Sequence, residues 1–448
     1  MARGYMDRLL NVNLTTGKLS EESLPEELCR KYIGGYGIGA RLLYDRIPAG
    51  ADPLGPDNIL GFLTGPLTGT QCIEGNRSVV VCKSPLTGTW GDANCGGTFG
   101  PYLKFAGFDG ILFSGKASKP VYLYIEDGKA ELRDASHLWG KDTNETEAIL
   151  KEELGDVEIA SIGQAGERLS LISCIINDLG RAWGRSGVGA VMGSKKLKAI
   201  AVKGSMTVPV ADEARVRTLR REYLKRHGGG PYDTLVPHGT IGITAESSQS
   251  GDTPIKNWGG VGEVDYPQGE KVFEPDMLIE KYQTKKYGCW RCTMACGGHM
   301  EVKEEGPYQG VAHHKPEYET AGSFGPMTLV DDFPALIKAN ELCNKYGLDT
   351  ISAGCTLAFA IECFENGLLS KEVTDGIELR WGDHLAMNAM LEKLALREGF
   401  GDVLADGVKV AAEKIGKGSE QYAIHVQGQE LPMHDPKFTP ALATTYVM

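Results

Sequence analysis

Three cysteines, Cys289, Cys292 and Cys296, lie close together in the chain with the spacing C-x2-C-x3-C. Three thiolates this near one another can converge on one point, which is unfavourable unless a metal centre takes up their negative charge. Ligation by sulfur alone at short spacing is typical of iron–sulfur clusters and of zinc sites. The motif therefore predicts a metal centre around which the neighbouring segments must fold.

The spacing alone leaves two kinds of metal centre open, and unligated core cysteines are a third interpretation. A zinc knuckle would need a second ligand pair, but no second C-x2-C and no H-x3-H follows the motif. His299 lies near, yet together with the three cysteines it would crowd one tetrahedral zinc ion. A four-iron cluster with a fourth ligand from a distant part of the chain fits the spacing better.

The composition limits the class of protein. With 448 residues, of which 42% are hydrophobic and 24% charged, the chain is long enough for two or three globular domains. Its 59 glycines are nearly twice the average share, which indicates many tight turns or close approaches of the backbone to a ligand. The formal net charge of −12 argues against nucleic acid or an anionic membrane as a partner.

The chain does not open on a signal peptide, and no apolar run approaches the length of a membrane span. We therefore expect a cytoplasmic protein without a membrane partner. In a reducing compartment the eleven cysteines are expected to be thiols or metal ligands rather than disulfides. Four of them lie in apolar runs and are interpreted as small core residues: Cys82, Cys174, Cys343 and Cys363.

The pattern of apolar residues changes near residue 208. Before it, short apolar runs bounded by glycine predict buried strands at 59–63, 78–82, 110–114, 121–125 and 199–202, with helical patterning only briefly at 145–153. After it, longer periods predict helices at 213–226, 275–287, 333–346, 352–366 and 383–397. The sequence thus predicts a sheet-rich domain followed by mainly helical structure.

Three glycine-rich segments, 75–78, 92–100 and 180–195, place arginines beside free backbone amides. Both groups suit a phosphate-bearing ligand, although glycines in turns and solvent-facing arginines would explain the same pattern. None of the segments matches a P-loop or a Rossmann fingerprint.

A fourth segment, 344–354, predicts a helix–helix corner with Gly347 ending one helix and Asp349 or Ser352 capping the next. Its amides and the Asp349 carboxylate could instead bind a heterocyclic ligand.

Two glutamates, Glu317 and Glu319, follow Cys296 by 21 and 23 residues. A carboxylate near a metal centre can serve as a general acid or base if burial raises its pKa, although most glutamates are simply solvated. The two side chains would point the same way in a strand and lie about 200° apart in a helix.

Several blocks together resemble the tungsten-dependent aldehyde:ferredoxin oxidoreductase family over the whole chain. They are LTTG at 14–17, YIGG at 32–35, TGPLTGT at 64–70, KSPLTG at 83–88, AVMGSK at 190–195 and GLDTIS at 347–352. The resemblance implies an α+β fold in which a two-sheet, β-rich domain (1–208) forms the base of a pterin cofactor. A helical domain (209–424) with the cysteine motif and the first pterin loop would follow, and residues 425–448 would begin a third, helical domain.

The resemblance also implies the site residues. Arg77, Asn94, Gly96, Arg181, Ala182 and Gly184 would lie against the pterins and their phosphates, and Cys289, Cys292 and Cys296 would hold a 4Fe–4S cluster. The family's D-x-x-G-L-D pterin loop falls on Asn344, Gly347, Leu348 and Asp349, where Asn344 replaces the first aspartate. Glu319 would be the catalytic carboxylate. The second pterin loop, the fourth cluster cysteine and an active-site histidine would lie beyond residue 448, so we expect a fragment of a longer chain.

The implied activity is the oxidation of a small aldehyde to a carboxylic acid at a tungsten bis-pterin, with Mg²⁺ bridging the pterin phosphates as an option. Electrons would leave through the cluster to ferredoxin or a similar low-potential carrier. We expect a homo-oligomer or a complex with electron-transfer subunits.

One alternative is the active-site subunit of a class II benzoyl-CoA reductase, which reduces an aromatic acyl-CoA ring. In that enzyme a metal-ligating cysteine takes the place of Glu319, so Glu319 favours aldehydes. A scaffold with structural zinc is a third, remote class.

Overall fold

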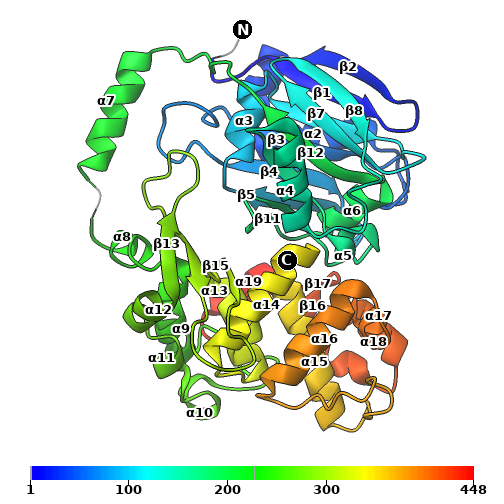
Figure 1. The fold of residues 1–448 in the computed structure, drawn as a ribbon, viewed down its shortest axis with the longest axis vertical. Helices are drawn as coiled ribbons and strands as arrows, with labels where there is room; N and C mark the ends of the chain where they lie inside the picture. Colours follow the sequence, from blue (N-terminus) through cyan, green and yellow to red (C-terminus); the bar gives the residue numbers. More distant parts are fainter. Residues whose placement is uncertain (1–2, 227, 448) are drawn as a thin grey trace. The chain divides into compact units, whose positions relative to one another are not determined.

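The computed structural model describes residues 3–226 and 228–447 (Figure 1). These residues form two compact units. The first comprises Met1–His227 together with Gly288–Thr293 and Asn344–Gly347, and the second comprises Gly228–Tyr287, Met294–Cys343 and Leu348–Met448. Cys289 and Cys292 thus belong to the first unit, whereas Cys296 belongs to the second.

Two six-stranded sheets form the frame of the first unit. One has the strand order β2-β1-β6-β3-β4-β5 and the other the order β11-β10-β9-β12-β7-β8. Strands β1 and β6 pair in parallel, as do β7 and β12, and the other described neighbours are antiparallel. The strands are β1 (Arg8–Asn13), β2 (Lys18–Ser23), β3 (Leu60–Thr64), β4 (Ser78–Lys83), β5 (Trp90–Cys95), β6 (Gly110–Ser114), β7 (Val121–Glu126), β8 (Lys129–Asp134), β9 (Glu158–Ser161), β10 (Ile175–Asn177), β11 (Arg181–Trp183) and β12 (Leu197–Lys203).

The main core of this unit is built from both sheets. Alternate residues of β1, β3, β4 and β6 meet alternate residues of β7 and β12 in one buried apolar cluster, as expected where two sheets pack face to face. Trp183 lies within this cluster and contacts the rings of Phe62 and Phe99 edge-on at centroid distances of 5.7 and 5.4 Å. The predicted β-rich first domain with two sheets is confirmed.

The first unit also holds more helix than the sequence predicts. Its helices are α1 (Glu26–Tyr32), α2 (Gly35–Arg46), α3 (Phe99–Phe105), α4 (Thr143–Leu154), α5 (Gln164–Glu167), α6 (Val188–Ser194) and α7 (Glu213–Leu224). The predicted helix at 145–153 is α4, which begins with a capping box between Asp142 and Glu145. Every residue of α6 is buried, so this helix has no polar stripe and gives no helical period in the sequence.

The second unit is mainly helical. Its helices are α8 (Pro231–Leu235), α9 (Thr244–Ser250), α10 (Gly262–Asp265), α11 (Gly269–Val272), α12 (Pro275–Tyr282), α13 (Tyr318–Phe324), α14 (Phe333–Tyr346, whose end lies in the first unit), α15 (Thr350–Glu365), α16 (His384–Leu396), α17 (Gly401–Leu404), α18 (Gly407–Ile415) and α19 (Pro440–Val447). Its strands are β13 (Gln283–Tyr287), β14 (Gly297–Glu301), β15 (Ala312–His314), β16 (His425–Val426) and β17 (Gln429–Glu430). The α+β class is confirmed.

One predicted helix ends early. The sequence predicts a helix over 275–287, but α12 ends at Tyr282 and the next five residues form β13. The reason is tertiary, because β13 pairs with β14, which follows the cysteine motif, in a three-stranded sheet with β15. Sheet pairing outweighs the weak helical preference of this polar stretch.

Within the described ranges, no helix combines the length and the apolar character needed to cross a membrane. None of the eleven cysteines, all of which lie in the described ranges, forms a disulfide, and the four interpreted as core residues are buried. The buried positions of Cys82, Cys174, Cys343 and Cys363 agree with their interpretation as core residues. The domain boundaries at 208 and 424 stay predictions.

Candidate active site

The first half of the cysteine motif is fixed to loops of the first unit. Trp290 N–H donates to the carbonyl of Gly97 at 3.2 Å, and its ring packs on Phe105 at 5.5 Å. Asn76 Nδ2 donates to the Trp290 carbonyl at 3.3 Å. Thr293 approaches Glu74 through its backbone N–H and its hydroxyl, at 3.4 and 3.2 Å from the same carboxylate oxygen. The glycine-rich segments 75–78 and 92–100 therefore position Cys289 and Cys292.

Among the described residues, no three His, Cys, Asp or Glu side chains are arranged to hold a single metal ion. The assignment of Cys289, Cys292 and Cys296 to a cluster stays a prediction. Cys292 N–H donates to the Cys289 carbonyl at 3.0 Å, so the two residues share one tight turn. A turn of this kind brings nearby side chains to one side of the backbone, as a common metal centre requires.

Two arginines and Cys289 gather around the buried thiol of Cys95. Burial raises the pKa of Cys95 to about 12, while the positive charges of Arg77 and Arg181 act in the opposite direction. Gly96 lies against the same groups. A Cβ atom on Gly96 would lie 2.8 Å from Cys289 Sγ and 3.2 Å from Arg77 Nη1, so a side chain here would collide with the cysteine. The structure thus brings together Arg77, Gly96, Arg181 and Cys289.

Arg77 and Asn94 also line a cavity of about 390 Å³ in the first unit, whose wall includes Ser78 and Tyr36. Two polar atoms beside it, Asn94 Oδ1 and Ser78 Oγ, are buried and have no hydrogen-bond partner within the described ranges. Buried polar atoms are normally paired, so these two have capacity for a polar ligand. An arginine, unpaired polar groups and a side-chain-free glycine together fit a phosphate-bearing pterin.

The remaining predicted pterin contacts of this unit lie on an edge strand. Ala182 pairs with Ile176 where β11 runs along β10, and Gly184 follows at the end of β11. Asn177 Nδ2 donates to the carbonyl of Arg181 at 3.2 Å, which holds the start of the strand. Arg181 and Ala182 are half-buried, and both are held by the sheet rather than by a flexible loop.

The corner at 344–354 has the predicted geometry. Gly347 has φ of +75° at the end of α14, and Asp349 caps α15 by accepting hydrogen bonds from the backbone N–H groups of Ile351 and Ser352 at 3.2 and 3.3 Å. Asn344 belongs to the first unit and accepts a hydrogen bond from Thr143 Oγ1 on its carbonyl at 2.8 Å. Its buried Nδ2 has no partner among residues 3–226 and 228–447. Leu348 and Asp349 belong to the second unit, and their ligand role stays a prediction.

Replacing Arg77 or Arg181 with Met should reduce pterin and tungsten content. Loss of a charge-assisted hydrogen bond costs about 1.5–3 kcal/mol, which corresponds to roughly 10- to 100-fold weaker binding. Tungsten and pterin per chain would be measured together with the melting temperature. Arg30→Met on the exposed face of α1 is the matched control. Normal cofactor content in both variants would show that neither arginine holds the cofactor.

Glu319 lies in the first turn of α13, and its neighbour Glu317 is the N-terminal cap residue of the same helix. Glu317 accepts a hydrogen bond from Thr240 Oγ1. In the helix the two side chains point to different sides. Glu319 Oε2 accepts a hydrogen bond from the backbone N–H of Met433 at 2.8 Å, and its Oε1 lies 3.7 Å from His434 Nε2. The two glutamates therefore have separate partners.

His434 links Glu319 to a second carboxylate. Its Nδ1 lies 3.0 Å from Asp252 Oδ2 and 3.1 Å from Asp252 Oδ1. Both of these oxygens accept, so Nδ1 carries a proton when Asp252 is ionised. The imidazole also packs on the ring of Tyr318 at a centroid distance of 5.2 Å. Burial first, and then the charges of Asp252 and Glu319, raise the pKa of Tyr318, which keeps this phenol neutral.

The sequence analysis missed Asp252 and His434. Their positions, 67 residues before and 115 residues after Glu319, follow no spacing rule. The side chain of Glu319 is 31% accessible, so this carboxylate is only partly buried. Met433 and His434, which are neighbours in the chain, both contact this carboxylate.

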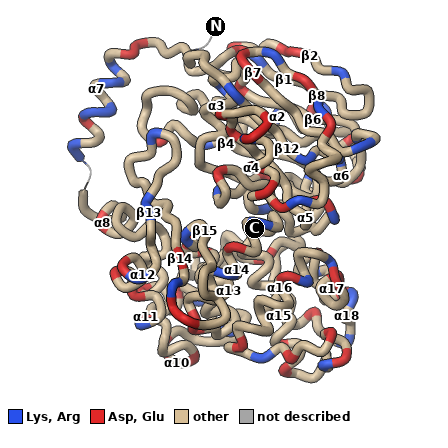
Figure 2. Tube along the Cα trace, viewed as in Figure 1, with Lys and Arg blue, Asp and Glu red and all other residues tan. Residues whose placement is uncertain are grey.

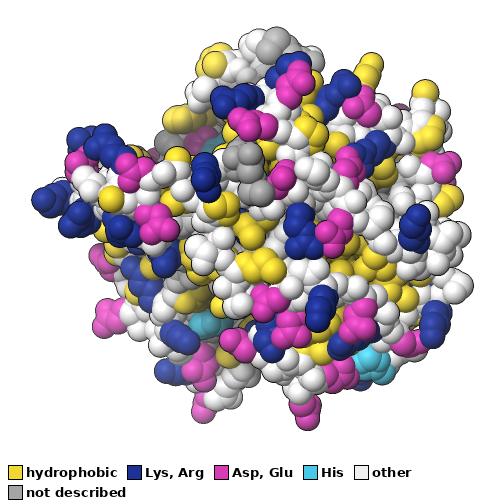
Figure 3. All heavy atoms as spheres, turned by 90° about the horizontal axis from the view of Figure 1, so that it is seen from above, with side chains coloured by type: hydrophobic (Ala, Val, Ile, Leu, Met, Phe, Trp, Pro, Cys, Tyr) yellow, Lys and Arg dark blue, Asp and Glu magenta, His cyan; other side chains and the backbone are white. Residues whose placement is uncertain are grey.

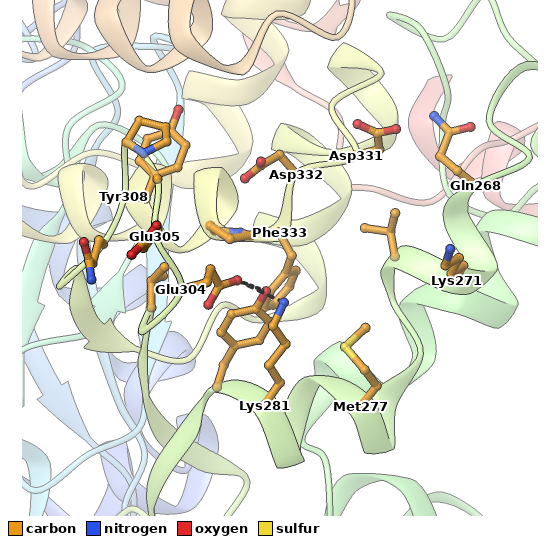
Figure 4. A pocket seen from close by; sticks show the side chains of 17 residues that line it. Gln268, Lys271, Met277, Lys281, Glu304, Glu305, Tyr308, Asp331, Asp332 and Phe333 are labelled. Carbon is orange, nitrogen blue, oxygen red and sulfur yellow. Dashed lines mark hydrogen bonds and ion pairs between the residues drawn. The ribbon is translucent and has the colours of Figure 1, made fainter.

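The second unit holds a further cavity of about 480 Å³ that contains none of the predicted site residues (Figure 4). Residues of α11, of α12 and of the loop before β15 form part of its wall. Glu304 in its wall is paired with Lys281 Nζ at 3.0 Å and accepts a hydrogen bond from Tyr282 at 2.7 Å. The cavity is thus separate from Glu319 and its partners.

Comparison with known proteins decides the family. The model of the aldehyde ferredoxin oxidoreductase N-terminal domain matches residues 9–204. The model of domains 2 and 3 of the same enzymes matches residues 150–448, which is more than half of the chain. The chain belongs to the aldehyde ferredoxin oxidoreductase family. The resemblance that the sequence blocks indicated is confirmed.

Relatives in this family are similar over nearly the whole chain. The tungsten-containing aldehyde ferredoxin oxidoreductase of Pyrococcus furiosus is 43% identical over 444 residues, covering 97% of this chain and 71% of that protein. The enzyme of the same name from Thermococcus kodakarensis is 42% identical with the same coverage. Among solved structures, the active-site complex BamBC of benzoyl coenzyme A reductase with 1,5-dienoyl-CoA has a TM-score of 0.86 at 30% identity. That match covers 96% of this chain and 66% of the BamBC chain, so this chain spans just under two thirds of that neighbour.

Proposed function

We propose that this chain oxidises small aldehydes to carboxylic acids at a tungsten bis-pterin and passes the electrons through a 4Fe–4S cluster to ferredoxin. Membership of the aldehyde ferredoxin oxidoreductase family supports the reaction class. The observation that carries the proposal for this chain is Glu319, a carboxylate held by the Met433 N–H and facing His434. The side chain at this position can take up a proton.

The described residues fit the cofactors. Arg77, Asn94, Gly96, Arg181, Ala182, Gly184, Asn344, Leu348 and Asp349 would hold the pterins, and Cys289, Cys292 and Cys296 would hold the cluster. When bound, the tungsten–pterin group supplies a Lewis acid and accepts two electrons. The proposal includes Mg²⁺ between the pterin phosphates. Mg²⁺ binds oxygen ligands, and the Asn94 Oδ1 atom has no partner among the described residues.

Glu319 would handle the protons of this reaction. Conversion of an aldehyde and water into a carboxylic acid releases two electrons and two protons. Met433 N–H donates to Glu319 Oε2, while Oε1 faces His434, so a proton-carrying group stands beside this carboxylate. His434 Nε2 is 3.7 Å from Oε1, and a small movement would allow the proton to pass to the imidazole. Asp252 would then stabilise the imidazolium through Nδ1.

Replacing His434 with Asn should lower aldehyde turnover by roughly 10- to 100-fold, less than loss of Glu319, because His434 acts through that carboxylate. A positioning role also predicts a displaced pH profile of kcat, since the group that receives the proton is gone. The matched control is His137→Asn, a half-exposed histidine paired with Glu153 in the first unit. An unchanged pH profile with wild-type turnover would exclude His434 from proton handling.

A second candidate function rests on the structural likeness to BamBC. Reduction of an aromatic acyl-CoA ring would use the same scaffold in the reductive direction. The test is to supply one tungsten-loaded sample with simple aldehydes and viologen dye, and separately with benzoyl-CoA and a low-potential donor. Dye reduction by aldehydes alone supports the first function, whereas ring reduction alone supports the second.

The cellular setting is part of the proposal. The cysteines of the described residues form no disulfides, which fits the reducing cytoplasm. We expect a homo-oligomer or a complex with electron-transfer subunits, because electrons must leave the cluster to another protein. Ferredoxin is the carrier that the family name indicates.

A further inference from the structure

Residues 213–226, which comprise helix α7 and the two residues that follow it, form a basic segment of an acidic chain. Residues 213–226 contain six Lys or Arg and two Glu, whereas the whole chain has a formal net charge of −12. Figure 2 shows α7 with blue segments along its length, and Figure 3 shows dark blue side chains gathered at the same side of the molecule. A local positive patch on a negative protein attracts an acidic partner to that patch alone.

No residue of helix α7 is buried. Three of its large hydrophobic side chains are exposed: Leu219, Tyr223 and Leu224. Arg217, Arg221 and Lys225 recur every fourth residue and therefore share one face. Arg217 is paired with Glu213 at 3.1 Å. Leu219 and Tyr223 lie on a different side of the helix from these three basic residues, so the exposed surface of the segment combines a basic face with an apolar one, a mixture found at protein interfaces.

The other face of α7 borders a groove of about 410 Å³ within the first unit. The groove is lined by residues 72–74 and by six residues of the α7 segment: Val216, Leu219, Arg220, Glu222, Tyr223 and Arg226. Arg220 Nη1 is buried here and has no hydrogen-bond partner within the described parts of the chain. A buried guanidinium nitrogen of this kind has capacity for a carboxylate. Arg220 and Arg226 balance the charges of Glu74 and Glu222 in this lining, so among the described residues the groove offers one unpaired guanidinium nitrogen beside apolar side chains.

The groove wall also contacts the cysteine motif. Glu74, which lines the groove, is the residue whose carboxylate faces the N–H and hydroxyl of Thr293. Thr293 directly follows Cys292. A protein bound over α7 and residues 72–74 would therefore lie next to the segment assigned to the cluster.

We propose that the α7 surface, formed by residues 72–74 and 213–226, is the docking site of a small acidic iron–sulfur electron carrier. The inference rests on the proposed function, because it assigns the place at which the electrons leave. Long-range attraction between the basic helix and an acidic carrier would speed encounter, and the groove would fix its orientation.

The test uses the tungsten-loaded enzyme and a purified acidic two-cluster ferredoxin. The triple variant Arg217→Glu, Arg221→Glu, Lys225→Glu reverses the shared basic face. The matched control is Lys18→Glu, Lys116→Glu, Lys129→Glu, which makes the same charge change at exposed sites of the first unit. Each enzyme is assayed with ferredoxin at several salt concentrations and with a viologen dye, which needs no docking site.

We expect the KM for ferredoxin to be about tenfold higher or more in the α7 triple variant than in the wild type. In this variant the KM should also change much less with salt concentration than it does in the wild type. The control and the dye-coupled rate should stay at the wild-type level, and Arg220→Met should raise the KM without changing the dye rate. Equal ferredoxin KM values in the α7 variant and the control would overturn the proposal. A second result would also overturn the proposal. If the wild-type enzyme is a dimer, the α7 variant is a monomer and the ferredoxin kinetics of the two are equal, the α7 surface binds a second copy of this chain instead of ferredoxin.

Failure of the proposed function gives a different result. If the wild-type enzyme reduces no dye with aldehydes, titration calorimetry of ferredoxin binding still tests the docking site. Salt-sensitive binding to wild type that is lost in the α7 variant supports the site, and equal binding to both contradicts it.

Discussion

Glu319→Gln is expected to lower aldehyde turnover by about 10²–10⁴-fold while tungsten and iron contents stay at the wild-type level. Glutamine can still accept the hydrogen bond from the Met433 N–H through its carbonyl oxygen, so the local structure should persist. What is lost is the ability to take up a proton beside His434. Rates are measured with viologen dye and divided by tungsten content, so that incomplete loading does not mimic a chemical defect.

The matched control for this experiment is Glu317→Gln. Glu317 lies two residues away, at the position just before α13, and its carboxylate contacts Thr240, so it has the same chemistry in a different place. Its loss should change turnover far less than loss of Glu319. If the two variants have equal rates close to wild type, Glu319 has no part in the reaction.

Cys292→Ser should remove most of the broad visible absorption of the iron–sulfur cluster and most of the activity. A serine oxygen is a harder and more basic ligand than a thiolate and is a poor substitute in an all-sulfur site. Iron, acid-labile sulfide and the visible spectrum are measured on protein purified without oxygen. Cys72→Ser, at another half-buried cysteine of the first unit, is the control and should keep all three.

The cluster assignment predicts a joint loss of iron and sulfide in the Cys292 variant. Retention of both at the wild-type level would count against the assignment and would revive zinc or unligated cysteines as interpretations of the motif. Zinc in the purified wild-type protein, without iron, would have the same consequence.

The fold class could be predicted because its main elements have strong local patterns. The buried strands β3, β4 and β6 are short apolar runs between glycines, and α14 has a regular helical period. Helix α6 could not be predicted because all its residues are buried. The strand β13 could not be predicted either, since its conformation depends on pairing with β14 across the cysteine motif.

The candidate site was only partly accessible from the sequence. Arg77, Gly96 and Cys289 could be proposed because motifs and family blocks name them, and the structure brings all three together. Asp252 and His434 could not, because their link to Glu319 exists only in three dimensions. The basic stripe of α7 is visible in the sequence, but its relation to Glu74 and Thr293 is not.

The most direct test of the account is aldehyde-dependent reduction of viologen dye by protein purified anaerobically from cells supplied with tungstate, with metal analysis of the same sample. Turnover should rise in proportion to tungsten content, in protein that also contains iron and sulfide in the ratio of a 4Fe–4S cluster. Protein that carries tungsten and the cluster but reduces no dye with any simple aldehyde would contradict it, as would protein that contains zinc and neither tungsten nor iron.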